Sequence, residues 1–168
     1  NYFDAELTLR EALKSALSER GANDSLAQAI VSAMAALLND SGRFKESEAV
    51  LNNSLRILEG IGVSPEAATY LLARSRLTDA LVGQSRWKDA LANHQASLDV
   101  LSGDPGLGKR FRMNSVSAIM ALLHTGQFDE ADSLLREKTS EAQQWLGVDH
   151  LNTAEFLALQ AVVRAKQG

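Results

Sequence analysis

The stretch LLNDSGRFKESEAVL, residues 37–51, carries the pattern that decides the fold. A run of helix-forming residues ends near Gly42, where a helix must stop and the chain must turn. A second run begins at Phe44, with a small residue, Ser47, three positions later and Leu51 seven positions later, which is the spacing of one helical face. The stretch therefore predicts two helices joined by a tight turn.

This pattern recurs about every 42 residues, so the chain contains an internal repeat. Each copy pairs an aromatic residue with a small residue three positions later: Tyr2/Ala5, Phe44/Ser47, Trp87/Ala90 and Phe128/Ala131. The residues seven positions after these aromatics are Leu9, Leu51, His94 and Leu135. Because His94 stands in a column of leucines, we interpret it as a packed core residue rather than as a ligand.

Apolar stripes and the glycines that follow them predict eight helices, at roughly 2–20, 25–40, 44–60, 65–82, 86–102, 112–125, 128–146 and 151–167. The connections are short, so sequential helices should pack antiparallel. A fixed rotation per pair should wind these pairs into a right-handed superhelical solenoid, which is an all-α fold. We expect one domain over residues 1–168, cut from a longer array, with full repeats at roughly 25–62, 65–103 and 112–147 and partial repeats at 1–21 and 151–168.

Composition and charge argue against several classes of function. The 168 residues are 45% hydrophobic and carry a formal charge of −4, so there is no chain-wide basic field to bind nucleic acid. The lack of cysteine and the scatter of the three histidines argue against a metal site. No apolar run reaches the roughly 18 residues needed to span a bilayer, and no signal-peptide pattern opens the chain. We therefore expect no metal, no membrane insertion and a cytoplasmic location.

Two of the turns resemble the tetratricopeptide repeat, in which a glycine, any residue and an aromatic are followed three positions later by a small residue. Gly42 and Phe44 with Ser47 have this form, as does the turn at 126–131, whereas the third copy has Gly83 four residues before its aromatic. The longer period and the segment LGVDHLNTA, residues 146–154, are similar to the kinesin-light-chain-like variety. The resemblance implies a non-enzymatic scaffold without a cofactor, which binds a protein or peptide segment on its inner surface.

A glycine-rich stretch, GDPGLGKR at residues 103–110, comes near the pattern of a phosphate-binding loop. Arg110 stands where a hydroxyl residue should contact Mg²⁺, and the preceding segment is helical in pattern rather than a strand, so we reject nucleotide binding. Lys109, Arg110 and Arg112 begin the next predicted helix and oppose its dipole. They form either a solvated loop or a rim that attracts an anion or an acidic partner.

Acidic residues open the second helix of several pairs, as Glu46 and Glu48 do after Phe44. There they complement the positive end of the helix dipole, which favours a structural role. General acid–base catalysis would also need a closed pocket, and a solenoid rarely provides one.

The candidate partner-binding residues lie on the face of each first helix that points away from its second helix. Projection from the turn aromatics places these residues there: Ser32, Ala36, Asn39, Ser75, Asp79, Val116, Met120, His124 and Arg164. The alternative is docking on an edge or on the convex face. A second hypothesis for the function is a regulatory sensor segment of a larger protein, which binds a small ligand or gates an attached domain. The last helix should also self-associate through Phe156, Leu159, Val162 and Val163, because its own second helix is missing.

Overall fold

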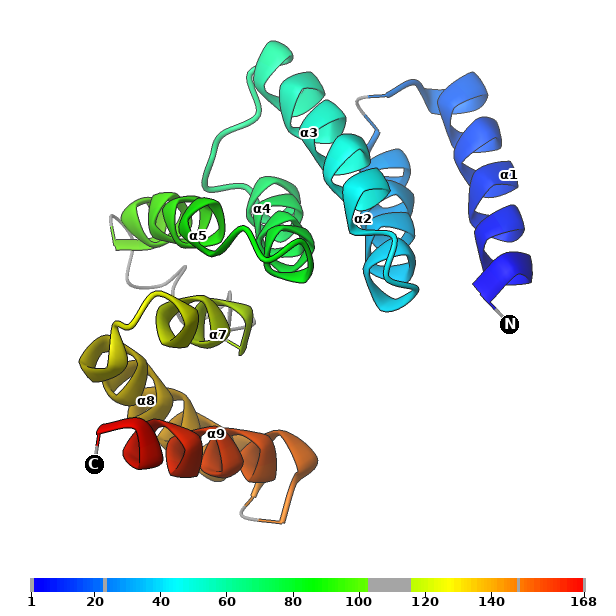
Figure 1. Ribbon diagram of the computed structural model, residues 1–168. Coiled ribbons are helices and arrows are strands. Elements are labelled where there is room, and N and C mark those ends of the chain that lie inside the picture. The colour runs from blue at the N-terminus through cyan, green and yellow to red at the C-terminus, as the bar shows by residue number, and fades with distance from the viewer. Residues whose placement is uncertain (1, 23, 103–115, 148, 168) are drawn as a thin grey trace. The chain divides into compact units, whose positions relative to one another are not determined.

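The computed structural model describes residues 2–22, 24–102, 116–147 and 149–167 (Figure 1). Within these ranges the chain is all-helical and contains no strand, as the sequence predicts. The helices are α1 (Tyr2–Arg20), α2 (Ser25–Asp40), α3 (Phe44–Gly60), α4 (Ala68–Gly83), α5 (Trp87–Ser102), α7 (Val116–His124), α8 (Phe128–Leu146) and α9 (Leu151–Gln167).

Two helices begin later than the sequence pattern predicts. α4 starts at Ala68 rather than at position 65, because the segment before it forms a turn in which the backbone N–H of Glu66 donates to the Ser64 hydroxyl at 3.3 Å. Ala67, which caps the helix, still has extended backbone with ψ 140°. α5 starts at Trp87, one residue later than predicted. Residues 112–115 of the sixth predicted helix lie outside the described residues.

The three turns that contain the repeat aromatics share one hydrogen-bond pattern. In each, the residue just before the aromatic donates its backbone N–H to a carbonyl five residues back, as Arg43 does to Leu38 at 2.8 Å and Arg86 does to Leu81 at 3.0 Å. The residue before that donor has a positive φ, which is +75° at Gly42 and +58° at Ser85. This is the helix-ending arrangement that normally requires glycine. Ser85 therefore stands where the other copies have glycine, which the sequence pattern alone does not reveal.

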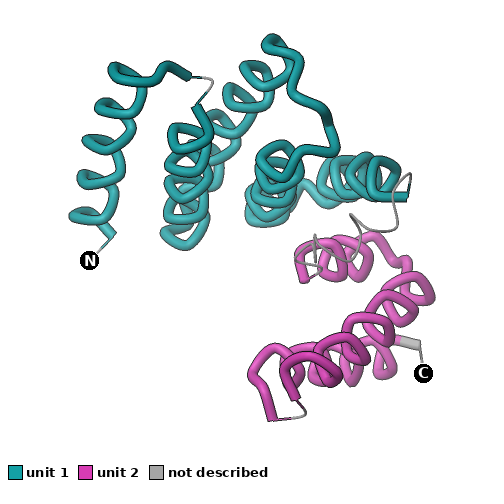
Figure 2. Tube along the Cα trace, turned by 180° about the vertical axis from the view of Figure 1, so that it is seen from behind, with its two compact units in different colours: residues 1–113 teal, residues 114–168 magenta. Residues whose placement is uncertain are grey.

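The chain divides by its internal contacts into two compact units, residues 1–113 and residues 114–168 (Figure 2). In the first unit each helix packs against the next one in sequence, from α1 to α5. In addition α2 contacts α4 directly, although α3 lies between them in sequence. The first helices of two consecutive pairs are thus neighbours. One hydrogen bond spans this contact, from Asn39 Nδ2 to the Arg76 carbonyl at 3.1 Å.

Three of the four small residues of the repeat are fully buried, whereas Ala5 in the first copy is exposed. Ser47 is fully buried, and its hydroxyl donates to the Ala35 carbonyl on the preceding helix at 3.1 Å. Ala90 and Ala131, its counterparts in later copies, are also fully buried, and His94 is buried in its leucine column as predicted. Larger side chains at these positions would force the paired helices apart.

The turn aromatic Phe44 joins one pair to the next. Its ring lies so close to Gly83, the last residue of α4, that a Cβ atom there would approach the ring to less than 3.0 Å. Phe44 on α3 therefore packs against α4, the first helix of the next pair. Trp87 and Phe128 are half-buried.

The arginines that follow Gly42 and Ser85 add a second link between helix pairs. Arg43 pairs with Glu46 on its own helix at 2.6 Å and also with Glu6 on α1. Arg86 repeats the arrangement with Asp89 at 2.7 Å and with Glu48 on α3 at 2.6 Å. The sequence of the third copy lacks both the arginine and the bridging glutamate of this link, because Gln127 replaces the arginine and Leu91 stands at the position of Glu6 and Glu48.

The second unit, which contains α7, α8 and α9, has its own core. Ile119, Leu135 and Val163 are fully buried there, and Phe128, Leu159 and Phe156 are among the partly buried residues packed against this cluster. Of the residues through which the last helix is predicted to self-associate, Val163 is fully buried, and Phe156 and Leu159 are partly buried against the same core. Self-association itself stays a prediction. Val162 alone of the predicted set is exposed, at 47%.

Candidate partner-binding surface

The open side of α2 carries an apolar stripe. Leu26, Ala29 and Ala33 are exposed and follow one another at the three- and four-residue spacing of a single helix face. Leu26 is 47% exposed although it is a large apolar residue. Because alanine side chains are short, a bound chain can come close to the α2 backbone along this stripe.

Neighbouring α4 has a more polar exposed side. Leu72 is 42% exposed, and one turn further along Arg76 pairs with Asp79 at 3.6 Å. We call these six residues of the two helices the α2–α4 surface: Leu26, Ala29, Ala33, Leu72, Arg76 and Asp79. It combines an apolar strip with a partly exposed ion pair, in which the side chain of Arg76 is 37% exposed and that of Asp79 is 16% exposed, so it offers both hydrophobic contact and hydrogen-bonding groups.

Five of the sequence-predicted residues lie within or beside this surface. Ser32, Ala36, Asn39, Ser75 and Asp79 are all half-buried. The amide donor of Asn39 is engaged by α4, as described above, so Asn39 joins the two helices instead of presenting that donor to a partner. On α2 the exposed stripe lies about one residue away from the projected one, which is a rotation of about 100° around the helix axis.

The other predicted residues do not belong to this surface. On α7, Val116 and Met120 are half-buried and His124 is exposed, and Arg164 is exposed on α9. All four are part of the second compact unit. The cationic rim at Lys109, Arg110 and Arg112 lies outside the described residues, as does the glycine-rich stretch before it.

Three glutamates near the turns are held as anions by their neighbours. Hydrogen bonds from Arg43 and then Arg10 lower the pKa of Glu6 below 4.5, and Arg43 also lowers the pKa of Glu46. The pKa of Glu48 is lowered by hydrogen bonds from Gln84 and from Arg86. A carboxylate with a lowered pKa is a poor proton carrier near neutral pH, so these groups fit a structural role better than acid–base catalysis. Among the described residues, no group of three or more Asp, Glu or His side chains is placed to hold a metal ion.

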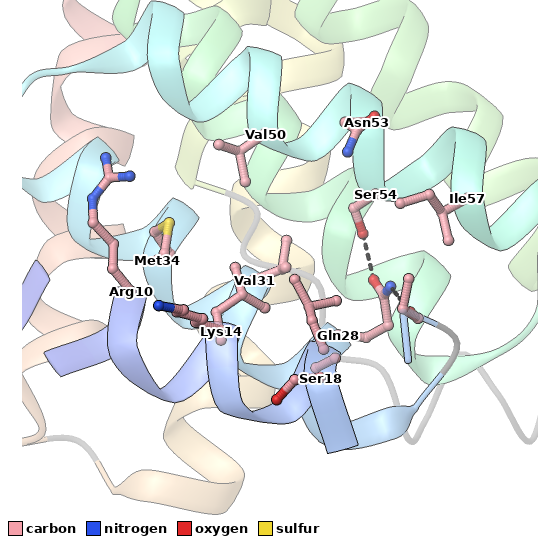
Figure 3. A pocket seen from close by; sticks show the side chains of 14 residues that line it. Arg10, Lys14, Ser18, Gln28, Val31, Met34, Val50, Asn53, Ser54 and Ile57 are labelled. Atoms are coloured by element: carbon pink, nitrogen blue, oxygen red, sulfur yellow. Dashed lines mark hydrogen bonds between the residues drawn. The ribbon is translucent and has the colours of Figure 1, made fainter. Parts of the chain in front are cut away.

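A cleft of about 690 Å³ opens between α1 and α3, with α2 as its floor (Figure 3). Its lining is largely apolar and includes Leu13 on the α1 wall and Val31 and Met34 on the α2 floor. Gln28 lies at one end, where its amide donates to the Ala22 carbonyl at 2.8 Å and accepts from the Ser54 hydroxyl at 2.6 Å. Sequence reasoning missed this cleft, because it depends on the separation of two helices that are not neighbours in sequence.

No family model matches the chain, and no curated protein matches it. Across the part of the chain that the structure describes, no helix is both long and apolar enough to cross a membrane.

Proposed function

We propose that this chain is a tetratricopeptide-like repeat protein that acts as a non-enzymatic scaffold, and that the α2–α4 surface binds a segment of a partner protein. The order of helices supports the repeat assignment, since each first helix packs on its own second helix and α2 also packs on α4. The equivalent turns at Gly42 and Ser85 support it further. A superhelical arrangement of the whole chain, a cytoplasmic location and the alternative sensor role stay predictions from the sequence.

The observation that carries this proposal is the apolar stripe left exposed on α2 beside the polar groups of α4. Leu26 and Leu72 each keep more than two fifths of their surface in solvent. Burying a fully exposed leucine contributes about 1.5 to 3 kcal/mol. Since Leu26 and Leu72 are each a little less than half exposed, covering what remains of both would contribute about 1.5 to 3 kcal/mol in total, toward the about 8 kcal/mol of micromolar affinity. Arg76 and Asp79 can then fix the register of the bound chain through charge-assisted hydrogen bonds.

A peptide-display selection against the intact chain tests the proposal. Enriched peptides are synthesised with a fluorophore, and their affinities are measured by anisotropy on the wild type and on Ala33→Arg. We expect Ala33→Arg to weaken binding at least tenfold, because the long cation fills the open stripe. Ala92→Arg is the matched control, since Ala92 is exposed on the second helix α5, outside the α2–α4 surface.

Comparison of Ala33→Arg with Ala92→Arg decides whether the enriched peptides bind at the α2–α4 surface. Equal affinity of the enriched peptides for the wild type and Ala33→Arg would overturn the assignment of the site to this surface. A selection that enriches no peptide sequence above a scrambled library would count against the scaffold function itself. Circular dichroism of both variants verifies that their helix content is unchanged.

A further inference from the structure

The α1–α3 cleft is lined by side chains with the spacing that one helix presents to another. On α1 the lining residues include Arg10, Leu13, Lys14 and Leu17, and on α3 they are Val50, Asn53, Ser54 and Ile57. Both sets follow the pattern i, i+3, i+4, i+7, which covers two helical turns. The walls therefore offer two parallel helical stripes with the apolar floor of α2 between them, and Figure 3 shows side chains from both walls around the opening.

The cleft is also selective in charge. Its 14 lining residues include two cations, Arg10 and Lys14, and no carboxylate, although the chain as a whole has a formal charge of −4. Glu6 already pairs with Arg10 at 2.7 Å. Lys14 is exposed and has no ion-pair partner within the described residues. One cation on an apolar wall is thus available to an anionic group of a ligand.

The polar groups at the opposite end of the cleft are already satisfied. Gln28 uses its amide nitrogen on the Ala22 carbonyl and its amide oxygen on Ser54, as described above. Figure 3 shows these groups at one end and Arg10 and Met34 at the other, with Val31 between them. A ligand that fits must therefore be apolar along its body and must carry its negative charge beside Lys14, which lies on the α1 wall between Arg10 and Gln28 (Figure 3).

We propose that the α1–α3 cleft binds an amphipathic α-helix of a partner protein, whose apolar stripe covers the floor and whose acidic side chain pairs with Lys14. The backbone N–H and C=O groups of a partner helix are hydrogen-bonded within that helix, so only its side chains need to enter the 690 Å³ cleft. The lining residues of each wall span two helical turns, which is the length of an apolar stripe at i, i+3, i+4 and i+7 on the bound helix. This surface lies on the other side of α2 from Ala29 and Ala33, so the proposal goes beyond the α2–α4 surface and adds a second docking site.

Two fluorescent model helices test the proposal. Each has about 14 residues, or four turns, with leucine at i, i+3, i+4 and i+7. The acidic probe carries glutamate beside the leucine stripe, and the basic probe carries lysine at the same positions. Their affinities are measured by anisotropy on the intact wild type, on Lys14→Glu and on Lys45→Glu, the last being a control because Lys45 is exposed on α3 but does not line the cleft.

We expect the acidic probe to bind the wild type with Kd on the order of 10 μM and to bind Lys14→Glu about tenfold more weakly. The basic probe should show the reverse preference, while Lys45→Glu should stay within about twofold of the wild type. Ala33→Arg should leave the binding of the acidic probe unchanged, so failure at this cleft and failure at the α2–α4 surface are distinguished.

Several results would overturn the proposal. One is the same affinity of the acidic probe for the wild type and Lys14→Glu, and another is the absence of any binding to the wild type. Displacement of the acidic probe by dodecanoate at concentrations far below the probe's own Kd would assign the cleft to a small anionic amphiphile instead. A dimer in sedimentation equilibrium that dissociates in Lys14→Glu would assign it to a second copy of this chain.

Discussion

Substitution of Gly83 by alanine tests the packing that joins consecutive helix pairs. Gly83 ends α4, and the ring of Phe44 occupies the space that a Cβ would need. Phe44 begins α3 and belongs to the preceding pair. An added methyl group must therefore displace an aromatic ring that two helix pairs share.

The expected loss of stability combines two opposing terms. Overpacking of this kind costs about 1 to 3 kcal/mol, whereas replacing a helical glycine by alanine contributes up to about 1 kcal/mol. We expect Gly83→Ala to lower the free energy of unfolding by about 1 to 2 kcal/mol. Gly60→Ala is the matched control, because Gly60 also ends a helix without a positive φ and nothing lies within 4 Å of its added Cβ. This control should be neutral or stabilising by up to about 1 kcal/mol.

Urea denaturation followed by circular dichroism measures the difference. With a slope of about 2 kcal/mol per molar urea, the two variants should differ in midpoint by about 1 M. In a Phe44→Leu background the cost of Gly83→Ala should fall by at least about 1 kcal/mol, since the flat ring is gone. A Gly83→Ala protein as stable as Gly60→Ala would refute the packing of Phe44 on the next pair.

Three further substitutions test other parts of the fold. Ser85→Gly should raise the free energy of unfolding by about 0.5 to 1 kcal/mol in urea titrations, because serine at φ +58° is strained. Ser140→Gly, in the exposed middle of α8, should instead lower it by about 0.5 kcal/mol, the difference in helix propensity between serine and glycine. The folded-state pKa values of Glu6, Glu46 and Glu48 lie below 4.5, so these ionised groups stabilise the fold above that pH and the contribution is lost as pH falls through the folded-state pKa values. Arg43→Gln should therefore flatten the fall in melting temperature on acidification, and an unchanged pH profile relative to Lys45→Gln would contradict the Arg43 link. Trp87→Ala should lower the free energy of unfolding by about 2 kcal/mol, less than for a fully buried aromatic, and a melting temperature equal to that of the wild type would remove Trp87 from the inter-helix packing.

Much of the helical framework follows from local sequence. Glycines at helix ends, apolar stripes and short connections predict the bounds of α2 and α3 to the residue. These signals act within one or two helical turns, so they are visible in a single sequence. The same logic fails at Ser85, because the tertiary structure holds serine in a conformation that local preference assigns to glycine.

The interactions between consecutive helix pairs are harder to predict from sequence than the helix bounds are. Glu48 complements a helix dipole by position, but its principal partner is Gln84, which lies 36 residues later and approaches only when the next turn folds. The helical projection of α2 places Asn39 on the exposed face, yet its amide donates to the Arg76 carbonyl on α4. A projection of one helix carries no information on how close a second helix lies. The α1–α3 cleft depends likewise on the separation of its walls.

The most direct test of the central claim is the map of backbone amide shifts when an enriched peptide binds the isotope-labelled protein of 18.1 kDa. We predict that the largest shifts fall on α2 and α4 around Ala29, Ala33 and Leu72, with helix content unchanged. Shifts confined to the residues that line the α1–α3 cleft, or spread evenly over the chain, would contradict binding at the α2–α4 surface.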